Sequence, residues 1–296
     1  MSSSQSTAPD RRIHAWREDL ADEALRNMVE ARAYTAGEAA GIAVPSAAVR
    51  RTPEPGGSLD TVAIHGERVT VFDCRQGWAW VQLARDRYVG YVEEGALGTP
   101  PGAATHRVAA LATFVYPEAD IKSPPLMRLP MASELVIADA DERFARLASG
   151  GFVVARHLIA RDQVVRDFVD VAERFIGMPY LWGGKSCDGL DCSGLVQLSL
   201  QMAGFECPRD SDMQEQALGE TVLLPDDLEG LERGDLVFWP GHVGIMTDGV
   251  MLIHANANQM AVSVEPLVSA ARRIAREENP IRTLKRLPGL CVSKVA

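Results

Sequence analysis

No run of 18 apolar residues occurs in the sequence, and cysteine is scarce. A helix needs about 18 or more consecutive apolar residues to cross a membrane, so no membrane-spanning helix is expected. The five cysteines are scattered and odd in number, which does not suit a disulfide framework and favours free thiols in a reducing compartment. Residues 1–28 lack an apolar segment followed by a small-residue cleavage site, so we expect a cytoplasmic location.

Positive charge is in deficit as well. The chain has 30 Lys and Arg residues against 40 Asp and Glu residues, a net charge of −10. Such a chain has no general attraction for nucleic acid or an anionic membrane, so neither is expected as a partner. The content of hydrophobic residues (47%) and charged residues (24%) is that of an ordinary globular protein and excludes the disordered and fibrous classes. The length favours more than one domain.

Residues 1–38 are predicted to form a polar tail followed by an amphipathic helix. Five apolar residues recur near helical spacing, namely Ile13, Trp16, Leu20, Ala24 and Met28. We expect this apolar stripe to pack on the rest of the protein.

Residues 39–161 consist of short β-branched and aromatic runs broken by Gly and Pro, a texture typical of small β-barrels. This region repeats itself weakly: "GYVEEGAL" (90–97) corresponds to "GFVVARHL" (151–158). The second copy lacks about five residues where the first has "ARDRY" (84–88). We predict two barrels, over 39–100 and 101–161, which resemble tandem bacterial SH3-like domains.

From residue 162 to 296 the pattern is that of an α+β domain. An apolar stripe from Val164 to Phe175 predicts one helix, which Gly177 ends, and a second helix is expected over about 192–203. Short strands are expected at 236–239, 242–246 and 250–256.

The segment "KSCDGLDCSGLVQ" (185–197) contains a cysteine, Cys192, whose role has to be identified. Cys192 could be half of a metal site, half of a disulfide or a nucleophile. Asp191 is a good N-cap, which would place Cys192 in the first turn of a helix. Unpaired N–H groups and the helix dipole stabilise a thiolate there and lower its pKa. The competing interpretation is a small buried core residue.

A thiolate nucleophile needs a base, and His242 and His254 are the histidines of this region's strands. If the turn between their strands is Asp248 and Gly249 alone, the two side chains lie on opposite faces. If Thr247 joins the loop, His242 lies directly across from His254. We predict the second register, in which one imidazole is the base and the other orients it.

Three segments together resemble the motifs of the NlpC-type family of papain-like cell-wall cysteine peptidases. They are "PYLWGGKSCDGLDCSGLVQ" (179–197), "RGDLVFWPGHVGIMTDG" (233–249) and "IHAN" (253–256). The resemblance implies Cys192 as nucleophile, His242 as general base and acid, and His254 as the orienting residue. It also implies cleavage between D-glutamate and a diamino acid in peptidoglycan stem peptides, without a cofactor or metal.

"CPRDSDMQ" (207–214) is similar to a further stretch of this family, with Asp210 where a neutral residue is more usual. Together with Tyr88, it resembles a subgroup in which an Asp-Ser pair and a barrel tyrosine enclose the free amine of L-alanine. A carboxylate is what an ammonium requires in a partly desolvated pocket. The full set of predicted substrate-binding residues is Tyr88, Trp182, Ser193, Arg209, Asp210 and Ser211.

Other interpretations of these residues stay open. Asp210 and Ser211 could cap a helix, and Trp182 could serve packing. Tyr91 competes with Tyr88 for the barrel position. A zinc site that includes Cys192 has ligand spacings unlike those of structural zinc sites.

The leading hypothesis is a cytoplasmic peptidase that recycles freed stem peptides of the form L-Ala-γ-D-Glu-diamino acid. One alternative is an exported wall hydrolase with the same chemistry. Another is a module that binds wall peptides and has no activity. The backbone N–H of Cys192 is expected to supply one donor of the oxyanion hole, and the sequence does not identify the second.

Overall fold

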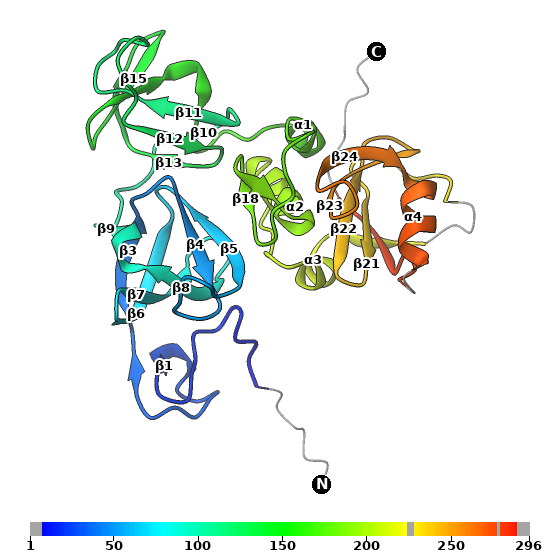
Figure 1. The fold of residues 1–296 in the computed structure, drawn as a ribbon, viewed down its shortest axis with the longest axis horizontal. Helices are drawn as coiled ribbons and strands as arrows, with labels where there is room; N and C mark the ends of the chain where they lie inside the picture. The colour runs from blue at the N-terminus through cyan, green and yellow to red at the C-terminus, as the bar shows by residue number, and fades with distance from the viewer. Residues whose placement is uncertain (1–7, 224–227, 277–278, 289–296) are drawn as a thin grey trace.

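The computed structural model describes residues 8–223, 228–276 and 279–288. Along the chain it contains an N-terminal segment (residues 8–37), a first β unit (38–98), a second β unit (106–160) and an α+β unit (168–286). Figure 1 shows the two β units in blue to green and the α+β unit in yellow-green to red. Within the described residues, no helix is long and apolar enough to cross a membrane.

The first β unit is a seven-stranded sheet in the order β5-β4-β8-β7-β6-β3-β9. Its strands are β3 (Glu38–Ile42), β4 (Ser46–Arg50), β5 (Leu59–Ile64), β6 (Arg68–Arg75), β7 (Trp78–Leu83), β8 (Val89–Glu93) and β9 (Leu97–Gly98). The 3₁₀ helix η2 (Glu94–Ala96) joins the last two. Their inward residues, among them Val49, Val81 and Leu83, form a core of their own.

The predicted N-terminal α-helix is absent from residues 10–33, and that prediction is wrong. This segment holds only β1 (Ala21–Asp22), the 3₁₀ helix η1 (Glu23–Leu25) and, just beyond it, β2 (Tyr34–Thr35). Groups elsewhere take the carbonyls that a helix would use: Val89 N–H donates to the Arg12 carbonyl at 2.7 Å, and the Gln82 side chain donates to the Ile13 carbonyl at 2.8 Å. Tertiary contacts with the first β unit therefore override the helical spacing.

The second β unit has three small sheets and a separate core. Its strands are β10 (His106–Val108), β11 (Ala112–Val115), β12 (Met127–Pro130), β13 (Glu134–Leu135), β14 (Ile137–Ala140), β15 (Phe144–Leu147), β16 (Phe152–Val154) and β17 (Leu158–Ala160). The 3₁₀ helix η3 (Ala155–His157) precedes β17 as η2 precedes β9. The three sheets are separate, so a second closed barrel stays a prediction.

The α+β unit is built on a six-stranded antiparallel sheet in the order β20-β25-β21-β22-β23-β24. These strands are β20 (Glu220–Val222), β21 (Leu236–Trp239), β22 (His242–Met246), β23 (Met251–Asn256), β24 (Ala261–Pro266) and β25 (Thr283–Arg286). A small hairpin pairs β18 (Lys185–Ser186) with β19 (Gly189–Leu190). The predicted strands at 236–239 and 242–246 are confirmed, and the third begins one residue later than predicted.

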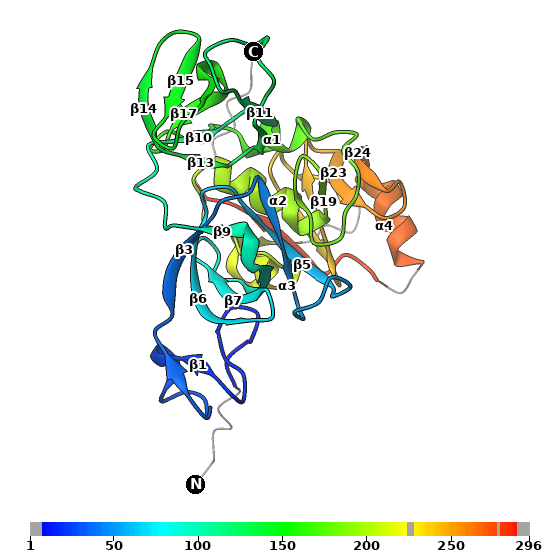
Figure 2. The same cartoon turned by 60° about the vertical axis from the view of Figure 1, so that its left-hand side comes forward.

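Four helices accompany this sheet in the described residues. They are α1 (Phe168–Glu173), α2 (Cys192–Met202), α3 (Ser211–Ala217) and α4 (Leu267–Ala275). Helix α1 is shorter than predicted because Asp167 caps its start and accepts the Val169 N–H at 2.8 Å. Helix α2 ends where predicted, at Gly204 with φ of +88°. All of its residues except Gln201 are buried, and it lies between the sheet and the β units (Figures 1 and 2).

Candidate active site

Cys192 is the first residue of α2, as the sequence predicts. The Asp191 carboxylate caps the helix by accepting the Gly194 N–H at 2.7 Å, and it also accepts the Gly183 N–H at 2.8 Å. The second bond ties the loop before the hairpin to the start of the helix. The thiol is therefore held at a fixed helix N-terminus, with 8% of the residue exposed.

Arg209 lies beneath this helix start and is 1% exposed. Its guanidinium pairs with Asp191 at 2.6 Å and donates to the Ser193 hydroxyl at 2.8 Å. Its Nε donates at 2.8 Å to the Thr61 hydroxyl of β5 in the first β unit. A buried pair of this kind is costly to break, because one partner is left charged and unpaired. The N-cap of α2 is thus linked to the first β unit.

Burial raises the pKa of the Cys192 thiol to about 12, and the Asp191 charge adds to the rise. The backbone N–H groups of Ser193 and Val243 and the charge of Arg209 act in the opposite direction. The expectation that the helix start lowers this pKa is therefore wrong, since desolvation outweighs the helix N-terminus. The interaction with Val243 N–H brings the thiol beside β22, next to His242.

His242 and His254 share one face of the sheet, but not in the predicted register. Ile245 pairs with Ile253, and continuing this register sets His254 opposite Gly244. The two histidines are therefore diagonal neighbours rather than directly opposite each other. The loop has three residues, as predicted, but it begins one residue later, because Asp248 accepts the N–H of Val250 and of Met251.

A chain of hydrogen bonds runs from His242 into the protein. His242 Nε2 lies 2.8 Å from His254 Nδ1, and His254 Nε2 lies 2.9 Å from a carboxylate oxygen of Glu265 in β24. Arg273 of α4 binds both oxygens of Glu265, at 2.6 and 2.7 Å, which lowers the pKa of this carboxyl. Glu265 is therefore ionised at neutral pH and acts only as an acceptor.

The ionised Glu265 fixes which ring nitrogens of His254 and His242 carry a proton. Because Glu265 accepts, His254 carries its proton on Nε2, and its Nδ1 accepts from His242 Nε2. Burial lowers the pKa of His254, and it lowers that of His242 to about 3, so both rings are neutral. His242 Nδ1 is then left with a lone pair that can take a proton.

The first β unit reaches this site with residues 84–88, which join β7 to β8. The matching loop of the second unit, 148–151, is only one residue shorter, because most of the predicted five-residue difference lies in the shorter strands β15 and β16. The Tyr88 hydroxyl lies 3.1 Å from Asp210 Oδ2, so the structure brings together two of the residues that are predicted to enclose the amine. Asp210 stands at the N-cap position of α3 without a capping bond from its side chain, so the capping alternative is wrong for this residue. Burial raises the pKa of Asp210, and Arg209, Arg12 and Tyr88 oppose that rise.

Asp86 inserts between Tyr88 and α2. Its carboxylate accepts from Gln197 at 2.9 Å and pairs with Lys185 at 3.5 Å, and both side chains of that pair are fully buried. Asp86 also accepts the Tyr88 N–H at 3.0 Å. The segment is therefore fixed to the α+β unit by a buried ion pair.

The remaining predicted substrate-binding residues lie in different settings. Trp182 is 64% exposed in the loop beside Asp191, and Ser211 is half-buried at the start of α3. Ser193 is buried against Arg209, and every N–H donor of Arg209 is engaged within the protein. Ser193 and Arg209 therefore support the start of α2, and the structure does not favour their direct contact with a ligand.

Sequence reasoning missed several residues of this site. Glu265 and Arg273 carry no motif, and only the strand pairing brings Glu265 to His254. Tyr180 lies near enough to Cys192 and Asp191 for their charges, with burial, to raise its pKa to about 12. It stands in the "PYLWGG" segment, so a signal existed. In the described residues no cluster of His, Cys, Asp and Glu is arranged to hold a metal ion.

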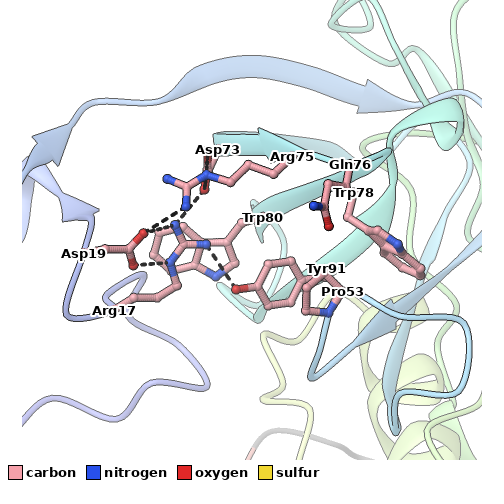
Figure 3. A pocket seen from close by; sticks show the side chains of 9 residues that line it. All are labelled: Arg17, Asp19, Pro53, Asp73, Arg75, Gln76, Trp78, Trp80 and Tyr91. Atoms are coloured by element: carbon pink, nitrogen blue, oxygen red, sulfur yellow. Dashed lines mark hydrogen bonds and ion pairs between the residues drawn. The ribbon is translucent and has the colours of Figure 1, made fainter.

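A cavity of about 700 Å³ lies away from Cys192, between the N-terminal segment and the first β unit (Figure 3). Trp78, Trp80 and Tyr91 line it together with Arg17 and charged neighbours. The Tyr91 hydroxyl accepts from Arg17 at 3.1 Å, so this tyrosine serves the N-terminal segment rather than Asp210.

Two parts of the chain match known families. Residues 49–97, in the first β unit, match the bacterial dipeptidyl-peptidase SH3 domain. Residues 177–273, in the α+β unit, match the NlpC/P60 family.

Relatives span most of the chain. Dipeptidyl-peptidase 6 of Lysinibacillus sphaericus is 27% identical over 213 residues, 64% of this chain and 77% of that protein. Gamma-D-glutamyl-L-lysine dipeptidyl-peptidase of Bacillus cereus is 27% identical over 243 residues, 71% of each chain. The crystal structure of a Bacillus cereus NlpC/P60 family protein aligns over 84% of this chain and 99% of that one, with a TM-score of 0.68 and 20% identity. The structural match establishes a shared fold.

Proposed function

Since this chain belongs to the NlpC/P60 family of cysteine peptidases, we propose that it cleaves the γ-D-glutamyl-diamino acid bond of stem peptides that carry a free N-terminal L-alanine. The observation that carries the proposal is the contact between Tyr88 and Asp210, at 3.1 Å, which joins the SH3-like domain to the peptidase domain. The name of the Bacillus cereus relative, a γ-D-glutamyl-L-lysine dipeptidyl-peptidase, supports the choice of bond.

In the proposed mechanism Cys192 is the nucleophile and His242 the general base. Because burial keeps the thiol protonated, its proton passes to His242 Nδ1 while Sγ attacks the γ-carbonyl carbon of D-glutamate. His242 then protonates the departing amine of the diamino acid, which leaves a thioester on Cys192. Water hydrolyses the thioester as His242 takes one of its protons and returns it to sulfur.

His254 and Glu265 support the positive charge that His242 gains in each transfer. A carboxylate at the end of two imidazoles stabilises an imidazolium without itself being protonated. The oxyanion is proposed to bind the Cys192 backbone N–H at the start of α2, where backbone N–H groups have no intrahelical partner.

Asp210 is proposed to bind the ammonium of L-alanine. It is partly desolvated, and a carboxylate in that setting favours a cation within hydrogen-bond distance. A stem peptide still attached to the glycan has an amide in place of that ammonium. The site would therefore prefer peptides already released from the wall, and a recycling role in the cytoplasm is part of the proposal. Cell fractionation tests the location, and recovery outside the cell would favour the exported hydrolase.

The direct test is product analysis by mass spectrometry. The protein and a Cys192→Ala variant are incubated with L-Ala-γ-D-Glu-diaminopimelate and with the same peptide N-acetylated. The proposal expects release of L-Ala-γ-D-Glu from the free peptide alone, and no release by the variant. Equal cleavage of both peptides would remove the amine-binding role of Asp210, and cleavage by the variant would remove the cysteine mechanism.

A further inference from the structure

We propose that Arg12, in the N-terminal segment, is a specificity-determining residue that orients Asp210 for the substrate ammonium. The Arg12 Nη1 lies 2.9 Å from Asp210 Oδ2, although the two residues are 198 positions apart. The inference rests on the proposed function, because it concerns the same carboxylate. It makes the segment before the SH3-like domain a part of the substrate site.

The N-terminal segment is anchored on the first β unit. Val89, the residue after Tyr88, donates its N–H to the Arg12 carbonyl at 2.7 Å. Arg17 lies over the Trp80 ring and binds Asp73 at 2.7 Å (Figure 3). These contacts hold the backbone of Arg12 beside Val89. The preceding residue, Tyr88, also binds Asp210.

Every N–H donor of the Arg12 side chain is engaged, and these bonds hold the guanidinium in this position. Its Nη1 binds Asp210 and Asp212, its Nη2 binds Asp212 and Asp10, and its Nε binds Asp10. All five N–H donors of the guanidinium are therefore used by three carboxylates. An arginine that blocked the site and withdrew on binding would have to break all of these bonds.

The contacts of Asp210 are unevenly divided between its two oxygens. Oδ2 accepts from Arg12 at 2.9 Å and from the Tyr88 hydroxyl at 3.1 Å, whereas the one contact of Oδ1 among the described residues is Tyr88 at 3.5 Å. Arg12 and Tyr88 thus hold one oxygen and leave the other for a ligand. Three carboxylates share the single Arg12 charge, and Arg209, whose charge also acts on Asp210, is itself paired with Asp191, so net negative charge remains to attract an ammonium.

The test compares Arg12→Ala and Arg12→Lys with the wild type and with Arg26→Ala, a control that removes an exposed arginine of the same segment. KM and kcat are measured for the free and the N-acetylated tripeptide. We expect Arg12→Ala to raise KM for the free peptide about tenfold with kcat within about twofold, and Arg12→Lys to recover part of the loss. Arg26→Ala should match the wild type.

A lower KM in Arg12→Ala would show that Arg12 competes with the substrate, and an unchanged KM would show that it is not involved; either result overturns the inference. Binding of the free tripeptide to Cys192→Ala and to Cys192→Ala/Arg12→Ala, measured by calorimetry, gives a readout independent of turnover, and equal affinities would also overturn it. If Asp210→Asn abolishes the preference for the free amine while Arg12→Ala retains it, the proposed function stands and the role of Arg12 fails. If the wild type shows no preference, the proposed function itself fails.

Discussion

The two β units hold opposite ends of helix α2. The first unit contacts the end that carries Cys192 through Thr61 and Arg209, and it contacts the middle of the helix through Asp86 and Gln197. The second unit contacts the other end, where Arg107 donates to the carbonyls of Gln201 and Met202. These are the last carbonyls of the helix, where the helix dipole favours a cation. The Gln201 carbonyl also accepts the Gly204 N–H at 3.2 Å, and the Met202 carbonyl accepts the Val165 N–H at 3.0 Å.

The difference between the units comes from residues 84–88. In the first unit this segment supplies Asp86 and Tyr88 between β7 and β8, whereas a shorter turn at 148–151 joins β15 to β16 in the second. One unit therefore contributes a hairpin loop to the site, and the other serves as a support. The side chains of this loop, rather than the β scaffold, carry the added function.

The largest effect is expected when the buried contact of the first unit is broken. Asp86→Leu leaves Lys185 charged, buried and unpaired, so we expect a loss of about 3–5 kcal/mol in the free energy of unfolding. Urea denaturation measures it. The double variant Asp86→Leu/Lys185→Met should recover most of the loss, and a double variant as unstable as the single one would show that the ion pair is not the cause.

A smaller loss of stability is expected at the second unit's end of α2. Arg107→Met removes donors from buried helix carbonyls, which should cost about 1–3 kcal/mol. The preference for a free amine should be unchanged, since Arg107 does not contact the first unit's residues at Asp210. Altered selectivity in this variant would erase the distinction between the two units.

Selectivity should respond to one tyrosine of the first unit and not to its neighbour. Tyr88→Phe removes the hydroxyl that binds Asp210, and we expect KM for the free peptide to rise about threefold to tenfold. Tyr91→Phe removes the bond to Arg17 instead and should leave the selectivity close to that of the wild type. Equal effects of the two substitutions would contradict the assignment.

The raised pKa of the Cys192 thiol, at the end of α2 that the first unit contacts, can be tested directly. Because burial raises the Cys192 pKa to about 12, the thiolate is scarce at neutral pH and becomes more abundant as the pH rises. The rate of alkylation at Cys192, followed by peptide mass mapping, should rise by about tenfold per pH unit from about pH 7 to 9. A plateau across this range would indicate a preformed thiolate–imidazolium pair.

Local signals predicted much of this molecule. The N-cap Asp191, the start of α2 and the strands that carry His242 and His254 follow from short-range patterns. The N-terminal segment did not, because Val89 and Gln82 take backbone carbonyls that a local pattern assigns to a helix.

Side-chain bonding within a loop and long-range pairing were the other sources of error and omission. The hairpin register depends on a side-chain bond of Asp248, which moves the loop by one residue while keeping both histidines on one face. Glu265 reaches His254 only through the pairing of β23 with β24, and Arg12 reaches Asp210 only through the packing of the N-terminal segment. Neither contact has a sequence motif.

The most direct test of the account is the ratio of kcat/KM for the free tripeptide to that for the N-acetylated tripeptide, measured in the wild type and in Asp210→Asn. The account predicts a ratio of about 100 or more in the wild type, as expected when a charge-assisted contact is lost, and a ratio near one in the variant. A wild-type ratio near one would contradict the claim that the first β unit and Asp210 together select a free amine.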